Sequence, residues 1–144
     1  MRSRSKAREI ALCILYELEI FRYKLNFTDL INTYFENYPK KEPAKNFSLQ
    51  LVEGVINNLF PIDEVIKKYV KNWEIERIAI IDRNILRIAS FELLFLADIP
   101  PKVSINEAVE LAKKFGDIDS PRFVNGILDK IYKAESKKAS IQSI

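Results

Sequence analysis

The sequence predicts an all-helical protein, and three observations support this fold class. Apolar residues recur three or four positions apart in every segment between loops, which is the spacing of one helix face. Only three of the 144 residues are glycine, while 48% are hydrophobic and 30% are charged, a composition typical of helical rather than strand-rich proteins. Two segments near the C-terminal end carry helix-capping patterns. A chain of this length suffices for one domain or for two small helical lobes.

Four helices are predicted in the first half of the chain, over about residues 7–21, 30–38, 47–59 and 62–73. A loop that contains Pro39 and Pro43 with three charged residues separates the second helix from the third, because this composition cannot continue a helix. Pro61 favours the start of the fourth helix.

The segment 78–97 is apolar on nearly every side, so we expect a helix that is buried on several faces at the centre of a C-terminal lobe. The run Asp98-Ile99-Pro100-Pro101 ends it. Two further helices follow and bring the total to about seven. We expect an N-terminal lobe over about residues 1–75, a C-terminal lobe over about 76–135 and a polar tail at 136–144.

Both ends of the sixth predicted helix carry capping signals. Ser104 and Glu107 have the spacing of a capping box, and Gly116 stands where a left-handed C-cap is expected. Ser120 followed by Pro121 predicts the start of the last helix. The two capped helices hold the turn between them in place.

Most catalytic and cofactor-dependent classes are excluded by composition. The chain has no histidine and one cysteine, Cys13, which excludes the usual zinc sites and Ser-His or Cys-His catalysis. Its three glycines are far apart, so there is no glycine-rich phosphate loop, and no cofactor is expected. No signal peptide and no apolar run of about 20 residues is present, which predicts a cytoplasmic protein without a membrane segment. A binding protein is therefore favoured over an enzyme.

A cluster of cations opens the first helix, where the positive end of the helix dipole makes cations unfavourable. Its members are Arg2, Arg4, Lys6 and Arg8. Because the net charge is only +3, the position of the cations matters more than their number. The cluster is either a solvated helix end or a phosphate-binding arm. If all four contact phosphates, log affinity against log salt concentration has a slope near −3, at about −0.7 for each contact.

Two aromatic residues are candidates for a binding surface. Tyr16 projects away from the apolar stripe of the first helix, next to Leu12 and Cys13. This outer face could contact a partner protein, stacked bases or a neighbouring helix. Phe123 lies at the edge of the apolar stripe of the last helix, where it could join the core or stack on a base.

Charged residues also interrupt the most apolar helix. They are Asp82, Arg83, Arg87 and Glu92. Charged side chains in such apolar surroundings are expected to form ion pairs or to contact a binding partner. They form either an internal ion-pair network or a polar surface for a partner.

Several segments together resemble the bacterial transcription antitermination factor NusB family. They are Ala7-Arg8-Glu9 with Leu15-Tyr16, Leu51–Val55, Asp82–Ala89 with Glu92-Leu93, and, as the most specific, Ile105–Lys113 and Phe123–Asp129. The resemblance covers nearly the whole chain.

This resemblance implies a fold of two packed three-helix bundles. It implies binding of the single-stranded boxA RNA of ribosomal RNA operon transcripts, jointly with the small-subunit ribosomal protein NusE and within a transcription elongation complex. It places RNA at the basic start of the first helix, at Tyr16 and along the turn between the last two helices. The NusE partner faces the region of Glu76, Asp82 and Arg83. Leu12, on the outer face of the first helix, is a further expected contact with a partner protein. The residues expected at the RNA surface of the turn are Lys113, Lys114, Asp119, Arg122 and Phe123.

The sequence is also compatible with two alternative functions. Helical domains of this kind also resemble the N-terminal part of certain ribosomal RNA cytosine methyltransferases. A purely protein-binding scaffold, in which Leu12, Cys13 and Tyr16 cover a partner, is the other alternative.

Overall fold

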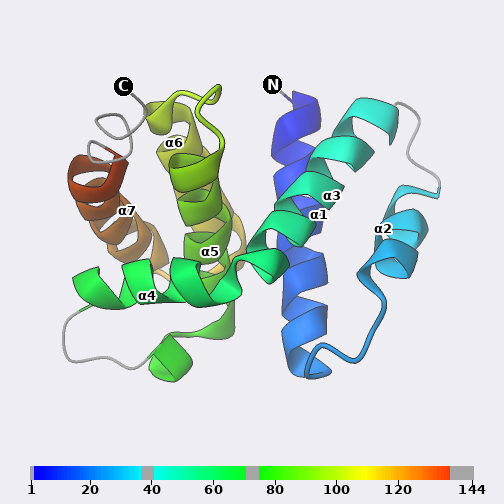
Figure 1. The fold of residues 1–144 in the computed structure, drawn as a ribbon, viewed down its shortest axis with the longest axis horizontal. Coiled ribbons are helices and arrows are strands. Elements are labelled where there is room, and N and C mark those ends of the chain that lie inside the picture. The colour runs from blue at the N-terminus through cyan, green and yellow to red at the C-terminus, as the bar shows by residue number, and fades with distance from the viewer. Residues whose placement is uncertain (1, 37–40, 71–74, 137–144) are drawn as a thin grey trace. The chain divides into compact units, whose positions relative to one another are not determined.

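The computed structural model describes residues 2–36, 41–70 and 75–136 (Figure 1). Within this part of the chain there are seven α-helices, one 3-10 helix, one short π-helix and no strand. The prediction of an all-helical fold is therefore confirmed. The elements are α1 (Arg2–Ile20), α2 (Phe27–Phe35), α3 (Lys41–Asn57), α4 (Leu59–Tyr69), η1 (Ile75–Arg77), α5 (Ile80–Phe95), α6 (Pro101–Phe115), α7 (Ser120–Ile131) and η2 (Tyr132–Ser136).

The chain divides into two compact units, Met1–Asn57 and Asn58–Ile144. The first unit contains α1 to α3, and the second contains α4 to α7. The predicted division near residue 75 is wrong, because α4 packs against α5 and α7 and so belongs to the second unit. Residues 71–73 of the fourth predicted helix, and residues 137–144 of the predicted polar tail, lie outside the described residues.

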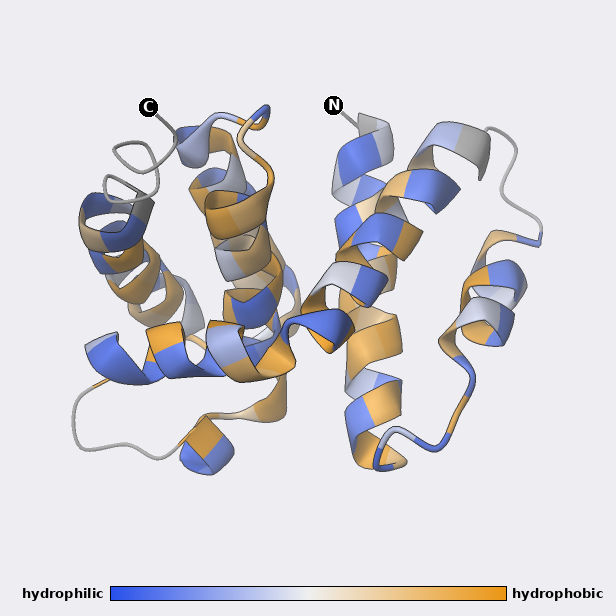
Figure 2. Cartoon of the chain, viewed as in Figure 1, coloured by the Kyte–Doolittle hydropathy of each residue, from blue (hydrophilic) through white to orange (hydrophobic). Residues whose placement is uncertain are grey.

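The first unit is a three-helix bundle in which every pair of helices is in contact. The buried hydroxyl of Ser48 in α3 donates a hydrogen bond to the Ala7 carbonyl of α1, with an oxygen–oxygen distance of 3.1 Å, and this bond helps to fix the register of the two helices. Hydrophobic and hydrophilic residues are interspersed along the helices, as expected for amphipathic segments (Figure 2). The largest fully buried side chains of this unit are Leu12, Ile14, Leu15, Leu18, Ile31, Phe35 and Leu51.

The second unit is built around α5. This helix contacts α4, α6 and α7, and α6 also packs along α7. All residues from Asn84 to Glu92 are buried. The prediction of a central helix that is buried on several faces is therefore confirmed. Helices α5 to α7 form a three-helix set, to which α4 is added as a fourth helix.

A buried ion pair joins α4 to α5. The Arg87 guanidinium donates from Nε to Asp63 Oδ1 at 2.9 Å and from Nη2 to Asp63 Oδ2 at 3.0 Å. A third nitrogen, Nη1, lies 3.2 Å from the side-chain oxygen of Asn84. This bidentate geometry satisfies both charges in a site with little water.

The start of α6 differs from the prediction. The helix begins at Pro101, one turn before Ser104, because proline is favoured at the first helical position. Ser104 is buried within the helix and donates its hydroxyl hydrogen to Glu92 Oε1 in α5, with an oxygen–oxygen distance of 2.7 Å. The predicted capping box at Ser104 and Glu107 is therefore wrong. Ser104 instead satisfies a buried carboxylate of the neighbouring helix.

Candidate nucleic-acid interface

Gly116 allows α6 and α7 to approach closely at the turn between them. Its backbone is extended, with φ −90° and ψ −168°, so the predicted left-handed C-cap is wrong. A Cβ atom at this position would lie 2.6 Å from the Cβ of Ser120 and 2.9 Å from the Ala112 carbonyl oxygen. Glycine is therefore required here for space rather than for a positive φ.

Ser120 organises the same turn through its hydroxyl group. The sequence predicted Ser120 as the N-cap of the last helix. In the structure Ser120 is the first residue of α7, and Asp119 occupies the N-cap position. The Ser120 hydroxyl accepts a hydrogen bond from the Asp117 amide at 3.0 Å. The Asp117 carboxylate in turn accepts from the Asp119 amide at 3.0 Å. These bonds fix the turn that leads from α6 into α7.

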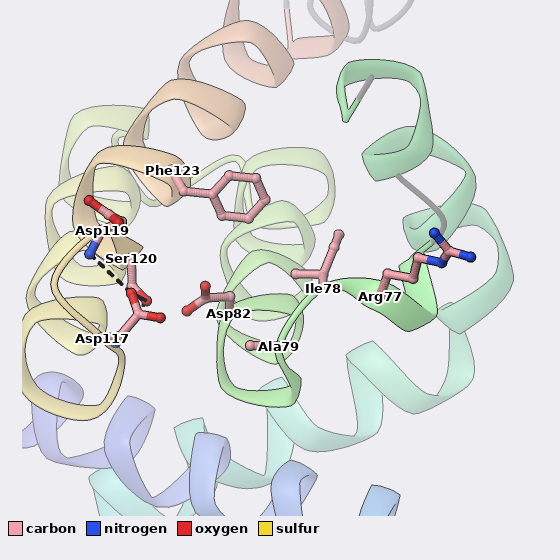
Figure 3. Close-up of a pocket in the computed structure, with 8 residues that line it drawn as sticks. All are labelled: Arg77, Ile78, Ala79, Asp82, Asp117, Asp119, Ser120 and Phe123. Carbon is pink, nitrogen blue, oxygen red and sulfur yellow. Dashed lines mark hydrogen bonds between the residues drawn. The ribbon is translucent and has the colours of Figure 1, made fainter. Parts of the chain in front are cut away.

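This turn forms one side of a pocket with a volume of about 510 Å³. Ligand pockets typically have volumes of about 300–1,000 Å³. The turn and the first residues of α7 supply one wall, and η1 with the start of α5 supplies the other. Figure 3 shows the Phe123 ring and the Asp82 carboxylate directed into the space between the walls, whereas the Arg77 side chain extends away from the carboxylates. The lining residues are Arg77, Ile78, Ala79, Asp82, Asp117, Asp119, Ser120 and Phe123.

Asp82 carries the strongest electrostatic anomaly of the pocket. Asp82 is 8% exposed, and its Oδ1 atom accepts no hydrogen bond from any residue that the structure describes. Burial raises the pKa of Asp82 most strongly, the hydrogen bond from Ser120 lowers it, and the negative charge of Asp117 raises it further.

The raised pKa of Asp82 has a defined effect on stability. Because the folded-state pKa lies above the unfolded one, the contribution of Asp82 to stability is fully present below the unfolded pKa. This contribution is lost as the pH rises through the folded pKa. An ionised Asp82 therefore opposes folding near neutral pH. A buried carboxylate that opposes folding is typical of a binding site.

The cations at the start of α1 occupy different environments. The guanidinium carbons of Arg4 and Arg8 lie 4.6 Å and 5.2 Å from the centre of the Phe47 ring of α3. Arg4 and Lys6 are exposed, but Arg8 is only 2% exposed. The predicted phosphate contact through Arg8 is therefore wrong, because a buried guanidinium that stacks on a ring cannot reach a phosphate. The Arg2 side chain lies outside the described residues.

Comparisons with known proteins place the chain in a family. The model of the NusB family matches residues 5–133. The chain belongs to the NusB family. The transcription antitermination protein NusB of Syntrophus aciditrophicus is 43% identical over an alignment that covers 100% of this chain and 88% of the relative. NusB of Geotalea uraniireducens is 45% identical, with 91% of this chain and 94% of the relative aligned.

Solved NusB structures share the fold. NusB from T. maritima superposes with a TM-score of 0.84 at 38% identity, over 94% of this chain and 95% of that one. A NusB chain crystallised with NusE and double-stranded RNA superposes with a TM-score of 0.81 at 32% identity, over 93% of this chain and 98% of that one. The predicted membership of the NusB family is therefore confirmed.

Two residues predicted on the outer face of α1 differ in accessibility. Tyr16 is 38% exposed, as predicted for a residue available to a partner. Leu12 is 1% exposed, so its predicted availability to a partner protein is wrong. The buried surface of α1 is wider than the predicted stripe. Phe47 of α3 also covers the side of α1 that carries Arg4 and Arg8. Leu12 lies on this same side, because it follows Arg8 by one helical turn.

The cations predicted near the α6–α7 turn are exposed. Lys113 forms an exposed ion pair with Glu110 at 3.3 Å, which is easily exchanged for another anion. The Lys114 ammonium lies 5.6 Å from the centre of the Phe115 ring. Arg122 is exposed on α7, whereas Asp119 and Phe123 line the pocket.

The charges of α5 divide into internal and accessible groups. Arg87 pairs with Asp63, and Glu92 accepts from Ser104, so both belong to internal networks as one interpretation predicted. Arg83 donates to the carbonyl oxygens of Glu76 and Ile78 at 3.1 Å and 2.6 Å and thereby fixes the rim formed by η1. Of the four charged residues, Asp82 lines the pocket.

Sequence reasoning missed several residues that build the pocket. Arg77, Ile78 and Asp117 carry no local pattern that distinguishes them from surface or core residues, and they become neighbours only when η1 meets the α6–α7 turn. The sequence identified Ser120 only as a helix cap. Its position in the turn before the last helix was the signal that could have assigned it to the pocket.

Metal binding and membrane insertion find no support in the described part of the chain. No three acidic or cysteine side chains among these residues are grouped so that they could hold a metal ion. None of the described helices combines the length and the apolar character needed to cross a bilayer.

Proposed function

We propose that this chain is a non-enzymatic transcription antitermination factor that binds single-stranded boxA RNA of ribosomal RNA operon transcripts together with NusE. Membership of the NusB family supports this function, and the similarity to a NusB chain crystallised with NusE and double-stranded RNA supports binding of RNA together with NusE. Such a factor acts on nascent transcripts, within a transcription elongation complex in the bacterial cytoplasm. The observation that carries the proposal is the pocket in which the Phe123 ring lies beside buried polar groups.

The pocket is suited to an unstacked base. Single-stranded RNA is recognised through bases that stack on aromatic rings and form hydrogen bonds along their edges. Phe123 supplies the ring, and Asp119, which is exposed, supplies polar atoms at the pocket. The exposed cations Arg4, Lys6, Lys113, Lys114 and Arg122, together with Arg2, would contact phosphates. Tyr16 offers a second aromatic surface for a base.

NusE is assigned to the outer side of η1 in this proposal. Glu76 is exposed there, and Arg83 holds the carbonyl groups of the same segment. A change at Glu76 would therefore alter the partner surface without removing a pocket residue.

A protein-binding scaffold is the second candidate, and one observation favours it. Ile20, Phe21 and Tyr23 at the end of α1 are all more than 40% exposed. Exposed apolar clusters of this kind can mark protein contacts. A scaffold would bind its protein partner with full affinity in the absence of RNA and would not distinguish RNA sequences.

Titration of RNA separates the two functions. A boxA strand and a scrambled strand of equal composition are titrated by fluorescence anisotropy, with and without NusE. We expect a preference for boxA that increases when NusE is present. Equal affinities for both strands under both conditions would contradict the proposal.

The Phe123→Ala variant tests the role of the pocket in RNA binding. We expect it to weaken boxA binding by about 1–3 kcal/mol, the range for loss of one base–aromatic stack. Phe60→Ala is the matched control, because Phe60 is 76% exposed on α4 and is absent from the pocket lining. The affinity of the control variant for boxA should equal that of the wild type. Equal losses in the two variants would mean that the pocket holds no base.

The salt dependence of RNA binding tests the role of the α1 cations. Because Arg8 is buried, three cations of this cluster remain available to phosphates. Their joint contribution to the slope of log affinity against log salt concentration is then about −2 instead of about −3. We expect Lys6→Ala to make the slope of log affinity against log salt less negative by about 0.7. Arg8→Ala should leave the slope unchanged and lower the thermal stability, since it removes the stack on Phe47. The reverse pattern would show that Arg8 contacts the phosphate.

A further inference from the structure

The α1–α2 turn, residues 21–24, exposes aromatic and basic side chains in alternation. Its sequence is Phe21-Arg22-Tyr23-Lys24, and all four residues are exposed. Phe21 is 54% exposed and Tyr23 is 41% exposed. The sequence has no acidic residue at positions 20–28, so the turn carries two positive charges and no negative one.

The backbone of the turn adopts a conformation that favours glycine. Arg22 and Tyr23 have positive φ values of 56° and 61°, which bulky side chains rarely adopt. The Tyr23 amide donates to the Leu18 carbonyl at 2.6 Å, and the Arg22 amide donates to the Glu19 carbonyl at 3.0 Å. This is the Schellman pattern of a helix end, in which glycine is usual at the position of Arg22. Helix termination therefore explains the shape of the turn but not its side chains, and such an outlier points to a function.

Hydrogen bonds within the chain fix the whole turn. The Phe21 amide donates to the Glu17 carbonyl at 3.0 Å, and the Lys24 amide donates to the Phe21 carbonyl at 3.2 Å. With the two bonds of the Schellman pattern, every backbone amide of the turn has a partner. A ligand therefore meets a preformed surface and does not have to order a loop, which lowers the entropic cost of binding.

The chemistry of the turn matches a single strand of RNA. Aromatic rings that stack on bases, together with cations that contact phosphates, are typical of sequence-tolerant binding of single strands. The nearby carboxylates oppose this little, because Glu17 and Glu19 are half-buried and Glu17 accepts a hydrogen bond from the Tyr34 hydroxyl at 3.2 Å. A protein partner fits less well, since lysine is depleted from protein interfaces.

Helix α1 connects the turn to the proposed RNA surface. Tyr16 and Ile20 are four positions apart, so they lie on the same side of the helix, about 6 Å apart along its axis. They are 38% and 47% exposed. This exposed stripe continues from Tyr16 to the end of α1, where the turn begins. A strand that lies on Tyr16 can therefore extend to the turn.

We propose that the α1–α2 turn is a second, sequence-tolerant RNA contact, which binds nucleotides that flank boxA on one side. Phe21 stacks on a base, and Arg22 and Lys24 contact the adjacent phosphates. This inference rests on the proposed function and goes beyond it, since it assigns nucleotides outside boxA to a surface of the first unit.

The test compares three RNAs, namely boxA alone, boxA with about six uridines added at the 5′ end, and boxA with the same addition at the 3′ end. Each is titrated by fluorescence anisotropy against the wild-type chain, Phe21→Ala and the control Phe60→Ala, which removes an exposed ring of α4. We expect the wild type and the control to bind one of the two extended strands at least about fivefold more tightly than boxA, the lower limit for one base–aromatic stack. Phe21→Ala should lose this gain and bind boxA alone with unchanged affinity.

The Arg22→Gly variant separates RNA binding from folding. Glycine adopts a positive φ without strain, so the thermal stability of the variant should equal or exceed that of the wild type. For the favoured extended strand, the slope of log affinity against log salt concentration should become less negative by about 0.7. A lower stability with an unchanged slope would show that Arg22 serves the helix end alone.

Four further outcomes would overturn the inference. They are equal wild-type affinities for the three strands, equal gains from both extensions, and a gain that persists in Phe21→Ala. The fourth is a loss of NusE binding in Phe21→Ala with unchanged RNA affinities, which would assign the turn to the protein partner. If boxA is still preferred over a scrambled strand, the inference fails alone. If that preference is also absent, the proposed function fails with it.

Discussion

Replacing Asp63 by alanine is expected to lower the free energy of unfolding by about 3–5 kcal/mol, the range for removing one partner of a buried ion pair. The Arg87 side chain is 6% exposed and donates to both carboxylate oxygens of Asp63, so the variant removes the carboxylate that pairs with a buried guanidinium. This loss is a large share of the total stability of about 5–15 kcal/mol of a typical domain. Urea unfolding followed by circular dichroism measures it.

Glu64→Ala is the matched control for Asp63→Ala. Glu64 is the next residue of α4 and pairs with Lys67 at 3.1 Å, but both side chains are about half exposed. The control should change stability by no more than about 0.5 kcal/mol. The double variant Asp63→Leu with Arg87→Met should recover most of the loss, because two apolar side chains need no counter-ion. Equal losses in Asp63→Ala and Glu64→Ala would refute the role of the buried pair.

Replacing Gly116 by alanine is expected to lower the free energy of unfolding by about 2–3 kcal/mol, the cost of overpacking a closely packed position. The new methyl group would lie 2.6 Å from the Ser120 Cβ and 2.9 Å from the Ala112 carbonyl oxygen. The Cβ atom of Ser120 cannot move away by side-chain rotation, so the turn between α6 and α7 must shift. Because Ser120 lines the pocket, this shift should also weaken boxA binding. Thermal unfolding and RNA titration of the same preparation measure both effects.

Gly126→Ala is the matched control for Gly116→Ala. Gly126 lies within α7, and no atom lies within 4 Å of the position of an added Cβ. Alanine is favoured over glycine inside a helix by about 0.5–1 kcal/mol, so this variant should gain stability. Its affinity for RNA should stay unchanged. A loss of stability at residue 126 as large as that at residue 116 would show that the close approach at Gly116 is not the cause.

Helical periodicity was sufficient to predict the helices because it records local geometry. Apolar residues at helical spacing predicted the face of α1 that contains Ile14 and Leu18 and the central position of α5. The capping signals were less reliable. Ser104 has the spacing of a cap but is buried against Glu92, because Pro101 starts the helix one turn earlier.

The boundary between the two units could not be derived from periodicity. The apolar face of α4 identifies a helix that needs a partner, but it does not identify which helices provide it. The Arg87–Asp63 pair and the packing of α4 against α5 and α7 decide this. Contacts between residues 24 positions apart in the sequence depend on the whole arrangement of helices.

The sequence by itself determined the helical fold class, the family and most of the residues at the candidate RNA surface, because these depend on local spacing and on recognisable motifs. The tertiary structure alone decided which of those residues can meet a ligand. It buries Arg8 and Leu12, commits Arg87 and Glu92 to internal partners, and brings Asp82 to the same pocket as Phe123. The physical reason is that exposure and pairing depend on neighbours from distant segments, whereas helix formation depends on residues within one or two turns.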